Sequence, residues 1–218
     1  MPIKVSDVMG RVAIAVRQDA RFGDIVAAMK RYAVGAVTVV DADHRPIGVV
    51  TQDDLLLKET DPVRHRTTIF EGAGIRQEHR KAAATIAGEL MTSPAITVTP
   101  GTPVRDAART MHEKKIRQLP VIDPATGRIT GTVHQADLLR VFERPVNELW
   151  AEVEETIRDV VRVDPRTLSI GVDGGIVTIA GQVGSRSQAL QLAESVRRLE
   201  GVIDVTCELT FTRDDVLL

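Results

Sequence analysis

An internal repeat in the first two thirds of the chain constrains the fold more than any other feature of the sequence. When Met9 is aligned with Met91, apolar and acidic residues match in type at an offset of 82, which becomes 83 after one inserted residue. The octet GVVTQDDL at 48–55 then falls on GTVHQADL at 131–138. A register that is kept over about 50 positions indicates two copies of one structural unit.

Both copies predict the same order of elements, β-α-β-β-α. A short extended run precedes an amphipathic helix with apolar residues at i, i+3, i+4 and i+7, and two strands flank a turn before a second helix. The predicted strands are residues 13–16, 36–40 and 49–51 in the first copy and 95–98, 119–122 and 132–134 in the second. Thr102 and Pro103 are expected to cap and open the first helix of the second copy. Because five such elements are too few to close a core, we expect an α+β fold in which the copies pack sheet to sheet as a pseudo-twofold pair.

The repeated octet places a polar side chain and a carboxylate where a strand passes into a helix. Thr51 can accept hydrogen bonds from the first N–H groups of that helix, and Asp54 lies in the first turn, where the helix dipole favours a carboxylate. The same groups suit ribose and phosphate recognition, because a carboxylate can accept hydrogen bonds from a vicinal diol and a helix N-terminus attracts an anion. Local sequence leaves both interpretations open.

The motifs D-V-M and G-V-V-T-x-x-D-L in the first copy, and L-M-T-x-P and L-P-V-I-D in the second, resemble a tandem pair of cystathionine-β-synthase (CBS) domains, a Bateman module, over residues 1–144. The resemblance implies that an adenosyl small molecule binds between the repeats as a regulatory ligand, either AMP, ADP, ATP or S-adenosylmethionine. It implies no obligatory cofactor. It also implies a homodimer formed through the CBS modules, which resemble discs that stack by twofold symmetry.

Carried over position by position, the resemblance implies two clefts, each completed by the opposite copy. Site one comprises Thr51, Asp54, Ile96, Ile116, Arg117 and Gln118. Site two comprises Ile14, Val34, Gly35, Ala36, His134 and Asp137. We expect site one to be used in preference, because it has a small hydroxyl and Arg117 could meet a phosphate. His134 either contacts phosphate in a pH-dependent way or caps the helix and blocks site two, and we favour the second hypothesis.

After residue 145 the repeat ends, and the pattern changes to α-β-β-α-β. It predicts an acidic amphipathic helix at 147–161, a hairpin that turns at Gly174-Gly175, a helix at 187–199 and a strand at 202–211, in which Cys207 is expected to be a small core residue. The motifs V-D-G-G-I-V-T-I-A-G-Q-V and E-G-V-I-D-V resemble the BON domain (bacterial OsmY and nodulation) over 146–214. That resemblance implies contact with phospholipid or the cell envelope. Because no export signal is visible, we favour a small packing or dimerisation domain.

The expected organisation is therefore a first CBS repeat at 1–60, an inter-repeat linker and helix at 61–86, a second CBS repeat at 87–144 and a BON domain at 146–214. The alanine-rich end of the linker is expected to form a helix that runs into Met91.

Composition and missing motifs narrow the function. A net charge of −2 with one Trp and one Tyr argues against nucleic-acid binding. The five histidines lack metal-ligand spacing and no catalytic motif is present, so we expect neither a metal site nor an enzyme. A single cysteine and the lack of an apolar run of about 20 residues favour a cytoplasmic protein. We expect a regulatory sensor that relays ligand binding through dimer geometry and the BON domain. The alternative is a structural or membrane-peripheral adaptor, in which the CBS pair dimerises and the BON domain contacts phospholipid or a protein partner.

Overall fold

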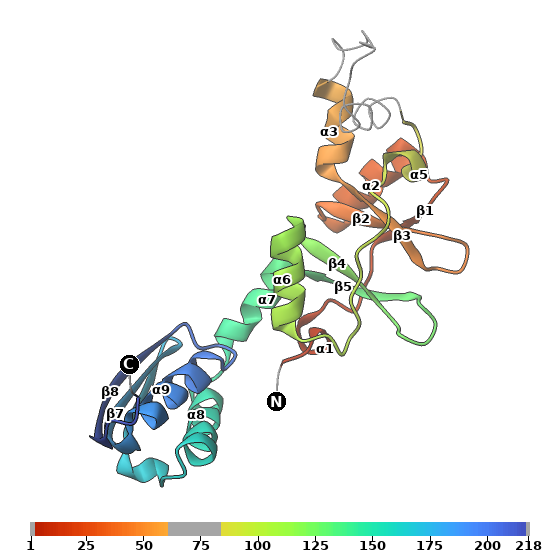
Figure 1. The fold of residues 1–218 in the computed structure, drawn as a ribbon. Coiled ribbons are helices and arrows are strands. Elements are labelled where there is room, and N and C mark those ends of the chain that lie inside the picture. Colours follow the sequence, from red (N-terminus) through yellow and green to blue (C-terminus); the bar gives the residue numbers. More distant parts are fainter. Residues whose placement is uncertain (1–2, 61–83, 217–218) are drawn as a thin grey trace. The chain divides into compact units, whose positions relative to one another are not determined.

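The computed structural model describes residues 3–60 and 84–216 (Figure 1). The chain divides into two compact units, one of Lys4–Leu138 and one of Leu139–Leu218 together with Met1–Ile3. Both units mix helices with small sheets, so the expected α+β class is confirmed.

The unit Lys4–Leu138 contains the two copies of the repeat, each with a sheet and two main helices. The elements of the first copy are β1 (Ala15–Arg17), α2 (Phe22–Tyr32), β2 (Ala36–Val40), β3 (Pro46–Thr51) and α3 (Gln52–Thr60). Those of the second are α6 (Val104–Lys114), β4 (Gln118–Ile122), β5 (Ile129–His134) and α7 (Gln135–Leu138). In the first copy β2 pairs parallel with β1 and antiparallel with β3, and in the second β4 pairs antiparallel with β5.

The extended run at 95–98 is not a strand, so the second copy lacks the first β element that was expected. Only Val98 pairs, in a parallel bridge to Val121, and its N–H donates to the Pro120 carbonyl at 3.1 Å. The expected cap is also displaced by one residue, because Pro103 is the N-cap and α6 begins at Val104. The Thr102 hydroxyl instead accepts the Thr99 N–H at 3.1 Å.

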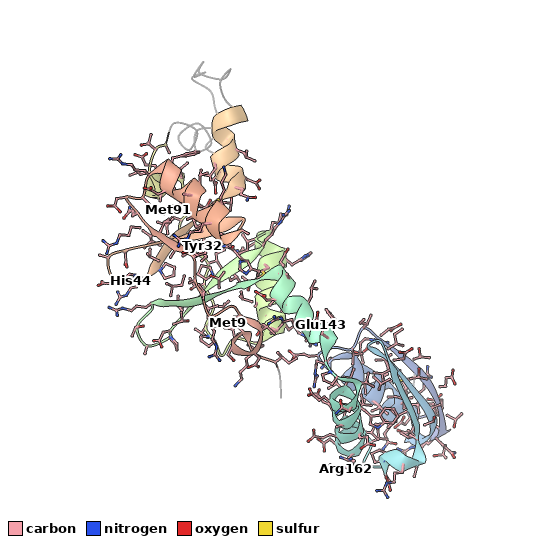
Figure 2. All side chains as sticks on the ribbon, turned by 180° about the vertical axis from the view of Figure 1, so that it is seen from behind. Met9, Tyr32, His44, Met91, Glu143 and Arg162 are labelled. Carbon is pink, nitrogen blue, oxygen red and sulfur yellow. The ribbon has the colours of Figure 1, made fainter. Side chains whose placement is uncertain are left out.

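Each copy is completed by a four-residue helix that precedes the other copy in the sequence: α1 (Val5–Val8), which was not predicted, and α5 (Ala87–Leu90). The segment around α1 joins the second copy, since the Val5 N–H donates to the Thr102 carbonyl at 2.8 Å and Gly10 bridges to Thr132. The segment around α5 joins the first copy, where Ala87 and Leu90 are fully buried in its core. Figure 2 accordingly shows Met91 beside α2 and Met9 near β5.

The expected helix running into Met91 is much shorter than predicted within the described residues. Ile86 forms an isolated bridge with Arg21, so its backbone is extended and the helix begins only at Ala87. The greater part of the predicted linker, residues 61–83, lies outside the described residues.

The unit Leu139–Leu218 has one sheet with two main helices packed on one face. Its elements are η1 (Leu139–Glu143), α8 (Val146–Val160), η2 (Pro165–Thr167), β6 (Ser169–Asp173), β7 (Ile176–Ser185), α9 (Arg186–Arg197) and β8 (Asp204–Arg213). The strand order is β6-β7-β8, with β7 antiparallel to β6 and parallel to β8. The core contains fully buried Val153, Ile157, Ile179 and Leu192. The predicted order α-β-β-α-β is therefore present, with two short 3₁₀ helices added.

The prediction for Cys207 is wrong, because its side chain is exposed. Its strand partner is the buried Ile179, so the thiol lies on the side of the sheet that the helices cover. Because β8 is an edge strand, the helices do not cover this position completely, and the thiol stays exposed. Partial desolvation raises the pKa of this thiol, against a smaller opposing effect of Arg197. A raised pKa makes the thiol a poor nucleophile at neutral pH.

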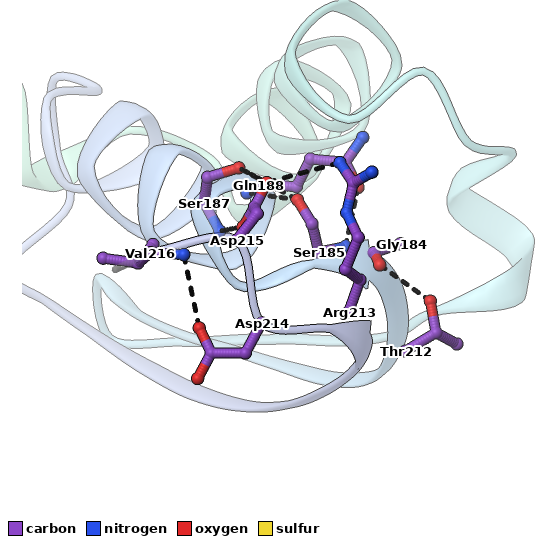
Figure 3. A network of polar contacts seen from close by, with 9 residues as sticks. All are labelled: Gly184, Ser185, Ser187, Gln188, Thr212, Arg213, Asp214, Asp215 and Val216. Atoms are coloured by element: carbon purple, nitrogen blue, oxygen red, sulfur yellow. Dashed lines mark hydrogen bonds and ion pairs between the residues drawn. The ribbon is translucent and has the colours of Figure 1, made fainter. Parts of the chain in front are cut away.

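A polar network ties the end of the chain to the start of α9 (Figure 3). The Ser187 N–H and hydroxyl donate to the two carboxylate oxygens of Asp215 at 2.9 and 2.8 Å. The Ser185 side chain caps the helix by accepting the Gln188 N–H. The two hydrogen bonds from Ser187, led by the one from its backbone, lower the pKa of Asp215 to about 2.

Asp215→Asn is expected to lower the melting temperature at neutral pH. It is also expected to make the melting temperature depend less on pH below pH 4. The ionised carboxylate is favoured in the folded state, so its contribution is complete above pH 4 and is lost as the pH falls towards about 2. Melting temperatures between pH 2 and 7 would show this, with Asp214→Asn as a control that removes an equal charge. An acid limb of unchanged slope in Asp215→Asn would contradict the prediction.

Candidate functional site

A cavity of about 500 Å³ lies between the two copies, where β3 meets α3 and β4 meets the end of α6. Its wall combines apolar side chains with a few polar and charged ones. The lining residues include Thr51, Gln52, Asp53, Pro94, Ile96, Lys115, Ile116, Arg117, Gln118 and His134. Small-molecule sites are typically apolar cavities of this size with a few placed polar groups.

Five of the six residues predicted for site one line this cavity: Thr51, Ile96, Ile116, Arg117 and Gln118. Asp54, the sixth, does not line it. Tertiary structure therefore brings together the first copy's Thr51 and a segment some 65 residues further along the chain, as the repeat pairing requires. That these residues bind a ligand stays a prediction.

Asp54 forms the helix-capping arrangement that the octet predicts. Its Oδ2 accepts both the backbone N–H and the hydroxyl of Thr51 at 2.8 Å, while the Thr51 Oγ1 accepts the Asp54 N–H at 3.2 Å. The Asp54 side chain is buried, so these bonds fix the start of α3. Capping and ligand binding are thus compatible, because Thr51 both closes the helix start and lines the cavity.

A second, smaller cavity of about 270 Å³ lies at the equivalent place in the pseudo-symmetric pair. Its lining is Val12, Ile14, Tyr32, Val34, Ala36, Gln118, Thr132 and His134. Of the predicted site-two residues, Ile14, Val34, Ala36 and His134 line it, whereas Gly35 lines the first cavity and Asp137 lines neither. Asp137 instead accepts the His134 backbone N–H at 2.9 Å, as Asp54 does for Thr51.

Lys115 and Tyr32 are lining residues that the sequence analysis missed. Lys115 ends α6 in the left-handed region at φ 55°, and the aligned residue Ala33 ends α2 at φ 52°. The repeat alignment contained this signal, because Lys115 and Arg117 pair with Ala33 and Gly35. Tyr32 is half-exposed at the second cavity, with the Arg31 guanidinium 5.5 Å from its ring centre.

The two cavities differ in charge. Two basic side chains, Lys115 and Arg117, line the first cavity against the single carboxylate of Asp53. The second cavity has neither a lysine nor an arginine in its lining. The first cavity is therefore suited to an anionic ligand, and the second to a neutral one.

The paired repeats with a ligand-sized cavity between them define a CBS pair, and comparison with known families agrees. Residues 5–60 and 87–144 match the CBS domain, and residues 146–213 match the BON domain. The chain belongs to the CBS-domain family and has a C-terminal BON domain. Both resemblances noted in the sequence are confirmed.

Relatives of the CBS part occur in archaea and plants. An uncharacterised protein of Methanopyrus kandleri is 27% identical over 64% of this chain and 62% of its own length. Another, from Methanocaldococcus jannaschii, is 30% identical over 69% of this chain and 34% of its own length. The chain thus spans less than two thirds of either relative.

Solved structures of CBS pairs share the fold. The CBS-domain protein CBSX2, known from Arabidopsis thaliana, crystallised in complex with AMP, matches with a TM-score of 0.55 and 25% identity over 63% of this chain and 94% of that chain. A CBS pair solved with 5′-methylthioadenosine and S-adenosyl-L-methionine matches with a TM-score of 0.51 and 19% identity over 66% of this chain and 98% of that chain. The second likeness supports the fold alone.

Within the described residues, no helix is both long and apolar enough to cross a membrane. The same residues contain no group of three or more His, Cys, Asp or Glu side chains placed to hold a metal ion.

Proposed function

We propose that this chain is a regulatory ligand sensor that binds an adenine nucleotide in the first cavity. The observation that carries the proposal is the pairing of Lys115 and Arg117 from the second copy with the Thr51 end of β3 from the first, across a largely apolar cavity. The two cations suit a phosphate group, and the apolar wall that contains Ile96 and Ile116 suits a flat base. The AMP complex of CBSX2 supports the same ligand class.

The charges of the first cavity favour AMP, ADP or ATP over S-adenosylmethionine. A sulfonium cation would be placed near Lys115 and Arg117 with only Asp53 to offset them. A phosphate would instead form charge-assisted hydrogen bonds with the same two side chains. We therefore assign the phosphate-bearing nucleotides to the first cavity.

We further propose that the chain acts as a homodimer without catalysing a reaction, and that the BON domain relays the ligand state to a protein partner. The segment 139–218 contains nine arginines and no lysine against fourteen acidic residues. Such a surplus of negative charge opposes binding to an anionic membrane. It favours the regulatory role over the phospholipid-contacting adaptor.

A thermal-shift experiment on the full chain tests the ligand. AMP, ADP and ATP are expected to raise the melting temperature, with stabilisation of about 2.7 kcal/mol at a hundredfold excess over Kd, and S-adenosylmethionine to raise it less. Absence of a shift with every nucleotide, combined with co-sedimentation with vesicles of phosphatidylcholine and phosphatidylserine, would instead support the adaptor.

A further inference from the structure

His134 contributes to both cavities rather than to the second alone. The lining of each includes His134 together with Ala36 and Gln118, and Gln118 is the strand partner of His134 across β4 and β5. The imidazole is 42% exposed, so it can meet a ligand. In the first cavity it joins Lys115 and Arg117 in a wall that already favours anions.

Asp137 holds one edge of the imidazole ring. Its Oδ2 lies 3.3 Å from Nδ1 of His134 and also accepts the His134 backbone N–H. In the first copy, the Thr51 hydroxyl takes the position of Nδ1 and is itself engaged with Asp54. The replacement of threonine by histidine therefore keeps a side-chain contact with the carboxylate three residues further along the chain and adds a second ring nitrogen, Nε2.

We propose that His134 is a phosphate-contacting residue of the first cavity, whose protonation sets the affinity of that cavity for anionic ligands. The proposal rests on the proposed function, because it concerns the same site. With Nδ1–H directed to Asp137, the neutral ring has an acceptor at Nε2, which repels a phosphate oxygen. The protonated ring has a donor there and a positive charge, which attract it.

The charged and titratable side chains that share a cavity or a contact with His134 are Lys115, Arg117 and Asp53 in the first cavity, Tyr32 in the second, and Asp137 in α7. A bound phosphate adds negative charge to this set. Binding of the nucleotide and uptake of a proton by His134 therefore strengthen each other.

Calorimetric titration of AMP into the full chain at pH 6 and pH 8 tests the proposal. Histidine ordinarily changes charge between these two pH values. We expect protonation of His134 to make AMP binding about three- to tenfold tighter at pH 6 than at pH 8. His134→Asn is expected to lose this part of the pH dependence. Because the phosphate of AMP itself titrates near pH 6, the quantity of interest is the difference between the two proteins.

Two controls isolate the imidazole. His112→Asn, an exposed position on α6 outside both cavities, is expected to keep the pH dependence of the natural chain. Adenosine lacks the phosphate, so its affinity is expected to show no difference between the natural chain and His134→Asn at either pH. Titrations near pH 7 in buffers of different ionisation enthalpy are expected to show greater proton uptake on AMP binding by the natural chain.

The possible results distinguish the role of His134 from the existence of the nucleotide site. If AMP binds with the same pH dependence and proton uptake in His134→Asn and the natural chain, the role of His134 is overturned while the nucleotide site stands. If neither protein binds AMP at either pH, the nucleotide site itself is overturned. A His134→Asn variant with a normal melting temperature shows that a changed affinity is not a folding defect.

Discussion

Arg117→Gln is expected to weaken AMP binding about tenfold or more while leaving the melting temperature of the free chain almost unchanged. The Arg117 side chain is exposed at the edge of the first cavity, so its loss does not disturb the core. A charge-assisted hydrogen bond to a phosphate contributes about 1.5–3 kcal/mol, and glutamine cannot replace the charge. Calorimetry with AMP and with adenosine measures the effect, and the affinity for adenosine is expected to change little.

Arg128→Gln is the matched control for this prediction. Arg128 is an exposed residue in the turn between β4 and β5 and does not line the cavity, yet its substitution alters the net charge equally. We expect AMP affinity within about twofold of the natural chain, since an exposed charge outside the site is screened by salt. Equal losses in Arg117→Gln and Arg128→Gln would mean that overall charge, and not a local phosphate contact, governs binding.

Gly131→Ala is expected to destabilise the CBS pair by about 2–4 kcal/mol. A Cβ at residue 131 would overlap the backbone carbonyl oxygen of Gly10 and approach the Met9 Cε to 3.0 Å. Gly10 cannot move aside freely, because its N–H donates to the Thr132 carbonyl at 3.0 Å and its carbonyl accepts the Thr132 N–H at 3.2 Å. The substitution thus forces apart the segment around α1 and β5. Urea denaturation followed by circular dichroism measures the loss.

Two other glycines calibrate the Gly131→Ala measurement. At Gly48, the aligned position, a Cβ would approach the Cγ and Cβ of the Met91 side chain to 2.8 and 2.9 Å, and a flexible side chain can partly yield. We expect a smaller loss there than at Gly131. Gly23, in α2, has nothing within 4 Å of an added Cβ. Gly23→Ala is therefore expected to leave the free energy of unfolding unchanged or to raise it by about 0.5–1 kcal/mol. A loss at Gly131 no larger than that at Gly23 would refute the steric explanation.

These glycines show how much of the fold the sequence could predict. The repeat places Gly48 and Gly131 at equivalent positions, directly before the predicted strands 49–51 and 132–134, which lie within β3 and β5. The reason for each glycine was not visible, because the crowding atoms belong to the segments around α5 and α1, which pack on the opposite copy. Periodicity records which face of an element is apolar but not which distant segment covers it.

The candidate site was likewise predictable from the sequence only in part. The helix start at Thr51 and Asp54 was predictable from the repeated octet, because capping depends on residues only three apart. The unequal charge of the two clefts was predictable in part, because Arg117 aligns with the uncharged Gly35, whereas the contribution of Lys115 was missed. Folding of the two copies onto each other was needed to show that Asp54 and Asp137 line neither cavity and that His134 lines both. Each cavity is bounded by side chains from both copies, so the residues that the two cavities share, Ala36, Gln118 and His134, can be identified only after the copies have packed together.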